Sequence, residues 1–364
     1  MRAFLRSQTC DFSLTVLFLP RCHNDQRGDN MSIKLQGEEK RIGLALSGGG
    51  FRAAAFHLGV FRKLDDLGLL SKIDLLTCVS GGSIAGGFLA SRWGEADVLD
   101  ELETYLSTRS IAVSSVIGGM FDPFESRLDK LAKSYDKHLF KKAKLDDLKA
   151  GPRIYINATN LSTGNMFFFV AGGNGESELG EWELGQKPAG KIRISTAVAA
   201  SSAFPPVFPP LRLDQDKYDT GEVEYVTLTD GGVYDNLGVN PMLRERNDLD
   251  YAFISDAGKP FDIDETPTDK GTVVLKESIG ILMEQVRGLQ FKRLELAHKA
   301  HNHPKPLWFS IDSALGEAQS GDANFASAIK TNLKKLKKAE LDLLTRHGGA
   351  LIEHRIREYA PELI

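Results

Sequence analysis

A serine follows an apolar run in the segment Cys78-Val79-Ser80-Gly81-Gly82. The small residues around it permit a tight turn from a strand into a helix, which presents the serine hydroxyl at the carboxyl end of a sheet. Ser80 is therefore a candidate nucleophile for acyl transfer. Cys78 replaces the first glycine of the usual G-x-S-x-G pattern, and a capping role for Ser80 or Ser83 is the structural alternative.

A second glycine-rich turn, Ser47-Gly48-Gly49-Gly50-Phe51-Arg52, also follows an apolar run. Ester hydrolysis places negative charge on the former carbonyl oxygen, and backbone N–H groups must already point at that oxygen. Gly48, Gly49 and Gly50 let the backbone come close, and the positive end of a following helix adds to the field. Arg52 could add charge or hold the loop.

The same segment also fits the dinucleotide-binding pattern G-x-G-x-x-A, from Gly48 to Ala53. That pattern requires an acidic residue about 20 residues on, at the end of the next strand, to bind ribose hydroxyls. The next strand ends instead at Ser80, which counts against a nicotinamide cofactor. We expect no cofactor and no metal, because acyl transfer through a serine requires neither.

A serine nucleophile needs a base, and of the eight histidines only His57 lies near either turn, inside an apolar helical run. Asp230 lies where a strand breaks into two glycines, so direct proton transfer from Ser80 to Asp230 is the economical hypothesis. An Asx turn would produce the same local pattern. Asp256 is the best rival base, and Asp235 follows it.

Alternating turns and apolar runs predict an α/β fold in which strand–turn–helix units form parallel strands with right-handed crossovers. Later strands mix continuous and alternating apolar patterns, which indicates a mixed sheet with some antiparallel edges. The predicted strands cover 41–46, 73–79, 153–158, 166–170, 224–228 and 251–255. The predicted helices cover 51–70, 83–93, 192–203, 275–301 and 326–347, and Gly68 marks the end of the first.

The organised domain is predicted to cover residues 37–364, after a poorly ordered extension over residues 1–36. The apolar residues 12–19 follow two arginines and imitate a signal peptide, so a signal, a leader and an upstream extension all stay open. Residues 97–149 are amphipathic and rich in Lys and Asp. We interpret them as a helical insertion or lid, in which Met120 and Phe121 are candidate lipid contacts.

The composition limits the partners and the compartment. The chain has 364 residues, 42% of them hydrophobic, and a formal net charge of -4, so concentrated positive charge for nucleic acid is not expected. The cysteines, Cys10, Cys22 and Cys78, lack zinc spacing and favour a reducing, cytoplasmic location. No run reaches the roughly 18 to 20 apolar residues of a membrane-spanning helix.

The motifs, in this order, resemble those of the patatin-like phospholipases, lipid acyl hydrolases that use a Ser–Asp dyad. Segment 47–52 is similar to the family's oxyanion loop, and its Phe-Arg ending is similar to animal cytosolic phospholipase A2. Segment 78–82 resembles the nucleophile elbow, 230–232 the dyad motif, and 199–205 the A-S-x-A-x-P block beside the dyad.

The resemblance, which runs from about residue 41 to about residue 257, implies a three-layer fold with a mostly parallel central sheet and helices on both faces. The C-terminal helices predicted over 275–364 lie outside the motifs that carry it. The resemblance implies that Ser80 and Asp230 are catalytic. It also implies that the oxyanion or substrate is bound by Gly48, Gly49, Gly50 and Arg52. The expected substrates are fatty-acyl esters of phospholipids or lysophospholipids. The altered elbow keeps a second hypothesis open, a catalytically impaired lipid-binding or membrane-associated protein on the same fold.

A peripheral membrane contact is a further hypothesis, based on a cluster of lysines interleaved with leucines: Lys330, Lys334, Lys335, Lys337 and Lys338. Such a segment could form a basic amphipathic helix that lies on anionic lipid, or simply the solvated face of a surface helix. The sequence leaves the oligomeric state open.

Overall fold

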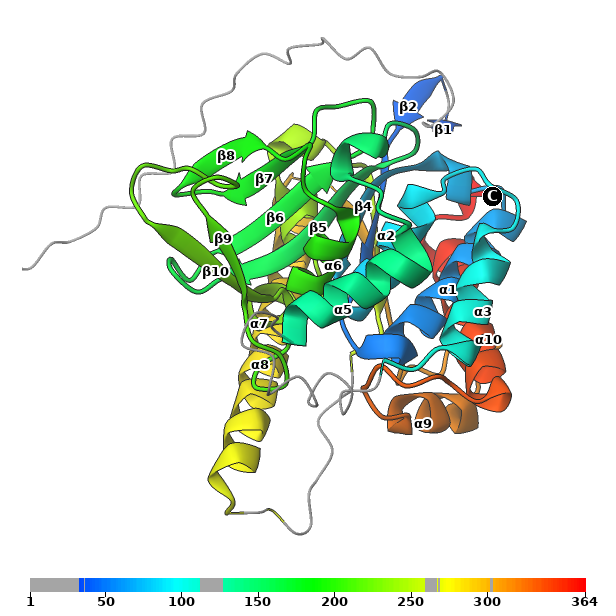
Figure 1. The fold of residues 1–364 in the computed structure, drawn as a ribbon. Coiled ribbons are helices and arrows are strands. Elements are labelled where there is room, and N and C mark those ends of the chain that lie inside the picture. The colour runs from blue at the N-terminus through cyan, green and yellow to red at the C-terminus, as the bar shows by residue number, and fades with distance from the viewer. Residues whose placement is uncertain (1–32, 36, 112–126, 259–266, 268, 302–303) are drawn as a thin grey trace, which may run out of the picture.

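A ten-stranded mixed sheet forms the centre of the fold (Figure 1). The structure is a computed structural model that describes residues 33–35, 37–111, 127–258, 267, 269–301 and 304–364. The strand order is β12-β11-β3-β4-β5-β6-β7-β8, with β10 and then β9 added beside β5. The strands are β3 (Ile42–Leu46), β4 (Ile73–Val79), β5 (Arg153–Asn160), β6 (Met166–Ala171), β7 (Glu178–Glu181), β8 (Gly185–Pro188), β9 (Leu211–Asp214), β10 (Tyr225–Asp230), β11 (Tyr251–Asp256) and β12 (Lys305–Ser310).

Strands β12, β11, β3, β4 and β5 are parallel to one another, whereas β6, β7 and β8 extend the sheet in antiparallel pairs. Every residue of β3 and β4 is buried. A strand covered on both faces needs apolar side chains at successive positions, which explains the continuous runs in the sequence. The α/β prediction and the mostly parallel sheet are confirmed.

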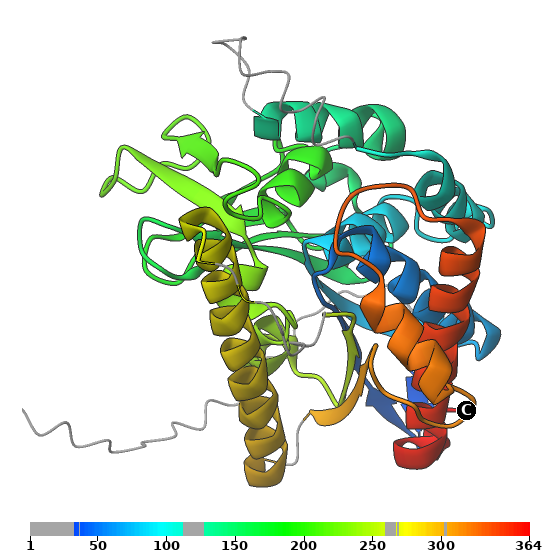
Figure 2. The ribbon, with the colours of Figure 1, turned by 90° about the horizontal axis from the view of Figure 1, so that it is seen from below.

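Helices cover both faces of this sheet (Figure 2). Helices α1, α2, α3 and α10 pack on one face, and α7 and α8 lie on the other. The helices are α1 (Gly50–Asp66), α2 (Gly81–Ser91), α3 (Val98–Thr108), α5 (Arg127–Tyr135), α6 (Ile194–Ser201), α7 (Gly232–Asp235), α8 (Gly271–His301), α9 (Ser320–Ala328) and α10 (Lys338–Tyr359). Short helical turns are η1 (Leu70–Lys72), η3 (Asp136–Phe140), η4 (Leu145–Asp147), η5 (Asn240–Leu243), η6 (Glu245–Asn247) and η7 (Pro361–Leu363).

Two strands meet end to end along one edge of β5. Strand β4 runs parallel to β5 and ends with Val79 opposite Asn157. Strand β10 approaches along the same edge from the other direction and ends with Asp230 opposite Ala158. The residue after β4 and the last residue of β10 therefore come together at the carboxyl edge of the parallel strands.

The predicted strands all exist, and Gly68, with φ of +69°, terminates the first helix as expected. The predicted helix 326–347 is wrong. Helix α9 ends at Ala328, residues 329–337 form an irregular segment with bends, here called the strap, and only then does α10 begin. Backbone hydrogen bonds join the strap to α3 and to the residue Ile111 beyond it, since Leu336 N donates to Leu106 O and Ile111 N donates to Leu333 O.

The lysine cluster is therefore no amphipathic helix. The two leucines between the lysines, Leu333 and Leu336, are buried in the main core, so they are unavailable for a lipid surface. The five lysines themselves are exposed, four on the strap and Lys338 at the start of α10. Charge, and not an apolar helix face, is what this segment offers to solvent.

The proposed domain limits meet the structure only in part. Residues 33–35, placed in the extension by the prediction, form β1 (Ile33–Leu35), which pairs with β2 (Glu38–Lys40). The proposed insertion 97–149 contains α3, α5, η3 and η4. The signal-like residues 12–19 and the lid residues Met120 and Phe121 lie outside the described residues.

Candidate active site

Ser80 occupies the sharp turn between β4 and α2. Its backbone φ is +50° and ψ is −111°, a conformation that a residue with a Cβ adopts only when its surroundings impose it. Such strain is characteristic of a nucleophile elbow. Cys78 fits without conflict because it lies within β4, where its Sγ is against Gly86 of α2; a Cβ at Gly86 would lie 2.4 Å from that sulfur.

The glycine loop after β3 packs directly against this elbow. A Cβ on Gly81 would lie 2.3 Å from Gly50 O, and one on Gly82 would lie 2.2 Å from Leu46 O. Real Cβ atoms do not approach that closely, so only glycine fits at either position. Gly49, with φ of +143°, and Gly50, with φ of +61°, adopt backbone conformations that favour glycine.

Some backbone N–H groups of the glycine loop already donate hydrogen bonds to other parts of the fold. Gly48 N donates to Asn236 O at 3.2 Å, and Phe51 N donates to Asn332 O at 2.9 Å. Within the described residues, no backbone carbonyl accepts a hydrogen bond from Gly49 N or Gly50 N. Of the three glycines predicted to bind an oxyanion, Gly49 and Gly50 therefore keep free donors, whereas Gly48 does not.

Asp230 lies beside Ser80 at the junction of β10 and β4. Its side chain is buried, and its Oδ1 accepts a hydrogen bond from Gly232 N at 2.7 Å. Burial raises the pKa of Asp230 to about 7, and Gly232 N and the nearby Ser80 side chain oppose that rise only in part. The structure thus brings together the two residues that the sequence nominated as nucleophile and base.

The end of α6 joins the two strand ends, a role that sequence reasoning did not assign. Ser201 Oγ accepts a hydrogen bond from Ser80 N at 2.9 Å, and Ser201 O accepts one from Gly231 N at 3.3 Å. Ala203 O accepts bonds from Asp230 N at 3.2 Å and Thr229 Oγ1 at 2.8 Å. The sequence feature that could have indicated this role is segment 199–205. Its polar residues stand next to small ones, which permit this close backbone contact.

Arg52 holds the loop. Its side chain is 1% exposed, Nη1 donates to Ile329 O at 3.0 Å, and Nη2 donates to Ala257 O at 2.8 Å. Burial lowers its pKa to about 10, opposed by the charge of Asp256. Of the two roles considered for Arg52, these contacts support loop anchoring, since both amino groups already bind carbonyl oxygens.

His57 is a buried core residue and not a base for Ser80. Its Nδ1 lies 2.8 Å from Ser255 Oγ and its Nε2 lies 3.0 Å from Ser47 O. Burial lowers its pKa to about 4, so the ring is neutral at physiological pH. Through Ser47 O, the His57 ring contacts the start of the glycine loop.

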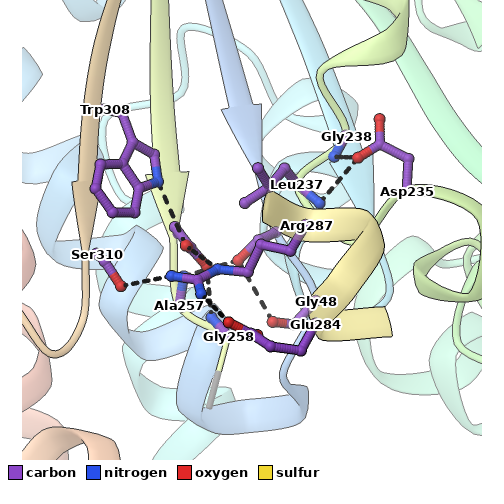
Figure 3. A network of polar contacts seen from close by, with 12 residues as sticks. Gly48, Asp235, Leu237, Gly238, Ala257, Gly258, Glu284, Arg287, Trp308 and Ser310 are labelled. Carbon is purple, nitrogen blue, oxygen red and sulfur yellow. Dashed lines mark hydrogen bonds and ion pairs between the residues drawn. The ribbon is translucent and has the colours of Figure 1, made fainter. Parts of the chain in front are cut away.

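The two rival bases are occupied elsewhere (Figure 3). Asp235 accepts hydrogen bonds from Leu237 N and Gly238 N, both at 3.1 Å, and so closes the loop after α7. Asp256 is paired through Oδ2 with Arg287 Nε of α8 at 2.7 Å and with Trp308 Nε1 at 3.3 Å. Burial raises both pKa values, but neither carboxylate is bonded to Ser80.

A strained serine between a parallel strand and a helix, beside a glycine loop, is the arrangement of α/β acyl hydrolases. The sequence profile of the patatin-like phospholipases matches residues 44–243, more than half of the chain. The chain belongs to that family. No curated protein sequence matches it.

Solved structures of a human enzyme share the fold at low sequence identity. Human GIVD cytosolic phospholipase A2 is 14% identical, with a TM-score of 0.60 over 89% of this chain and 60% of that chain. The same human enzyme in complex with methyl gamma-linolenyl fluorophosphonate gives a TM-score of 0.55 at 14% identity, over 92% of this chain and 60% of that chain. VipD from Legionella pneumophila is 12% identical, with a TM-score of 0.42 over 93% of this chain and 72% of that chain. The chain thus spans less than two thirds of the human enzyme.

The raised pKa of Asp230 predicts a pH dependence. A carboxylate can accept the Ser80 proton only when it is ionised, and a pKa of about 7 makes it half ionised near neutrality. We expect kcat/KM for a soluble uncharged ester to fall about tenfold per unit below pH 6 and to reach a plateau above pH 8. A profile that is flat from pH 5 to 8, in protein shown by circular dichroism to stay folded, would contradict this assignment.

Proposed function

We propose that this protein hydrolyses fatty-acyl esters of phospholipids or lysophospholipids through a Ser80–Asp230 dyad. The observation that carries the proposal is the junction on β5, where β4 and β10 end against each other. It places a strained serine beside a buried carboxylate whose pKa is raised to about 7. A general base is most effective when its pKa lies near the working pH.

The reaction follows from these groups. Asp230 takes the Ser80 hydroxyl proton as Oγ bonds to the ester carbonyl carbon, whose oxygen becomes negatively charged. Collapse of this intermediate breaks the bond to the glycerol oxygen, which leaves with the proton from Asp230. Water then gives a proton to Asp230 and attacks the acyl-enzyme, and its collapse releases the fatty acid and returns the proton to Ser80.

The oxyanion would be held by backbone donors at the contact of the two turns. Gly49 N and Gly50 N lack a backbone acceptor among the described residues, and the same is true of Gly81 N, the residue after the nucleophile. The helices α1 and α2 both begin here, so their positive ends add to the field. Removing one donor of this kind typically costs about 100- to 1,000-fold in kcat.

Fatty-acid release from phosphatidylcholine and lysophosphatidylcholine tests the dyad. Ser80→Ala should lower kcat by at least about 1,000-fold, because it loses the nucleophile. Asp230→Asn should lower kcat by at least about 100-fold, because it loses the base. The matched controls are Ser83→Ala, three residues away in the same turn, and Asp235→Asn, which alters the rival carboxylate. Both should stay within about tenfold of wild type.

Activity in Ser80→Ala would overturn the mechanism. A folded wild-type protein with no turnover on either lipid would favour the second function, a lipid-binding protein on the same fold. The altered elbow motivated that alternative, but the space beside Gly86 accommodates Cys78 in an ordinary strand conformation.

We propose further that the strap places the site against an anionic membrane surface. It crosses the start of α1, where Asn332 O accepts the hydrogen bond from Phe51 N and Ile329 O the one from Arg52. Four exposed lysines of the strap form no ion pair with any described residue: Lys330, Lys334, Lys335 and Lys337. Clustered lysines attract anionic lipid by about 1 kcal/mol each. In the described part of the chain, no helix is long and apolar enough to cross a bilayer.

Vesicle co-sedimentation tests this contact. Changing the four strap lysines to Gln should weaken binding to vesicles containing 30% phosphatidylserine by at least about tenfold and leave hydrolysis of a soluble ester unchanged. The control variant changes four exposed lysines elsewhere to Gln: Lys149, Lys187, Lys191 and Lys217. An equal loss of vesicle binding in the two variants would show only a net-charge effect. No loss of vesicle binding in either variant would show that the strap lysines do not contact the membrane.

A further inference from the structure

Two arginines lie over the same aromatic ring on the sheet. The guanidinium carbon of Arg244 is 4.7 Å from the centroid of the Phe168 ring, and that of Arg246 is 5.8 Å from it. Arg246 also lies 5.6 Å from the ring of Tyr155, which is itself 5.9 Å from the Phe168 ring. Both rings are buried in the second apolar cluster of the fold, so the two cations lie on a fixed aromatic surface.

The chain that carries the two arginines is fastened to the sheet. Arg244 follows η5, and Arg246 lies within η6. Asn247, the last residue of η6, is buried, and its Nδ2 donates to Pro241 O at 2.6 Å. Its Oδ1 accepts a hydrogen bond from Tyr155 Oη at 3.4 Å. The fold therefore holds the positions of both arginines before any ligand binds.

The pair is distinguished by a missing counter-charge. Each of the other described arginines that lie over aromatic rings also has a carboxylate oxygen within 3.7 Å: Arg92, Arg212, Arg287 and Arg355. In the part of the chain that the structure describes, no carboxylate forms an ion pair with Arg244 or Arg246. Glu245, the residue between them, is exposed and pairs with neither.

Most N–H groups of the pair are also unused. A guanidinium carries five N–H donors. Arg246 uses one of them to bond Gln186 Oε1 of β8 at 3.1 Å. Among the described residues, no atom accepts a hydrogen bond from the guanidinium of Arg244. Stacking on a ring covers the flat face of a guanidinium and leaves the N–H groups at its edge free to bind a ligand.

The surroundings of the pair are positively charged. Burial lowers the pKa of Arg244, and the charges of Arg246 and of Arg293 on α8 lower it further. The pKa of Arg153 on β5 is lowered by burial and also by Arg246, although its partner Glu178 lies 3.5 Å away. Like charges held close together repel one another, and a bound anion would relieve that repulsion.

We propose that Arg244 and Arg246 form a binding site for a phosphate group. The site lies over β5 and β6 and is separate from the end of β4, where Ser80 lies. Planar guanidinium groups bind phosphate oxygens through paired N–H donors. A phosphate monoester fits best, because it carries close to two negative charges and three acceptor oxygens. A free phosphorylated molecule and a lipid headgroup share this chemistry.

Isothermal titration calorimetry of the full-length protein with inorganic phosphate and with glycerol 3-phosphate tests the site. We expect saturable binding to one site per chain, at least about tenfold weaker in Arg244→Gln/Arg246→Gln. The control, Arg212→Gln/Arg357→Gln, also removes two positive charges, but from exposed arginines that already pair with carboxylates. The control should bind both probes like wild type.

Vesicles containing about 30% phosphatidic acid identify the source of the phosphate group. If it belongs to a lipid, the vesicles should bind wild type at least about tenfold more tightly than Arg244→Gln/Arg246→Gln. If it belongs to a free molecule, the vesicles should bind the two proteins equally, and glycerol 3-phosphate should still distinguish them in solution.

The proposal is wrong if wild type binds neither probe at concentrations up to about 10 mM and the vesicles do not distinguish it from Arg244→Gln/Arg246→Gln. It is also wrong if the two double variants lose binding equally, which would show only a net-charge effect. All three proteins should hydrolyse a soluble ester equally. Inactivity of all three would count against the proposed function and not against this site.

Discussion

The close approach of two glycine-lined backbones is the constraint on which the site depends. Strands β3 and β4 are parallel neighbours, so their turns emerge at the same edge. They can lie against each other only because Gly81 and Gly82 have no side chain, since Cβ atoms there would come within 2.3 Å of carbonyl oxygens. This contact sets the start of α1 beside the start of α2.

The second constraint is the burial of a single suitable carboxylate at that point. Asp230 arrives on an antiparallel strand that occupies the edge of β5 where β4 stops. Burial raises its pKa to about 7, so it is poised to exchange a proton near neutrality. The other two buried aspartates have different tasks: Asp235 closes a loop, and Asp256 binds α8 through Arg287.

Local patterns predicted the parts of the site, but not the contacts that assemble it. The Ser80 turn, the glycine loop and the Asp230 strand end were identifiable because glycine and apolar runs act over a few residues. That Ser80 and Asp230 meet depends on the register of β4 and β10 on β5, which pairs each strand with a segment about 70 to 80 residues away. The strap was missed because long-range bonds to Leu106 and Ile111 outweigh the helical propensity of its lysines and leucines. Arg52 was expected either to add charge or to hold the loop, and its bonds to two carbonyl oxygens support the second role.

The most direct test of the central claim is the covalent labelling of Ser80. Intact-protein and peptide mass spectrometry after treatment with a fluorophosphonate should show one adduct per chain, on the peptide that contains Ser80. Labelling should be absent in Ser80→Ala and at least about 100-fold slower in Asp230→Asn, because the hydroxyl then lacks its base. An adduct on another residue, or none on folded wild-type protein, would contradict the account.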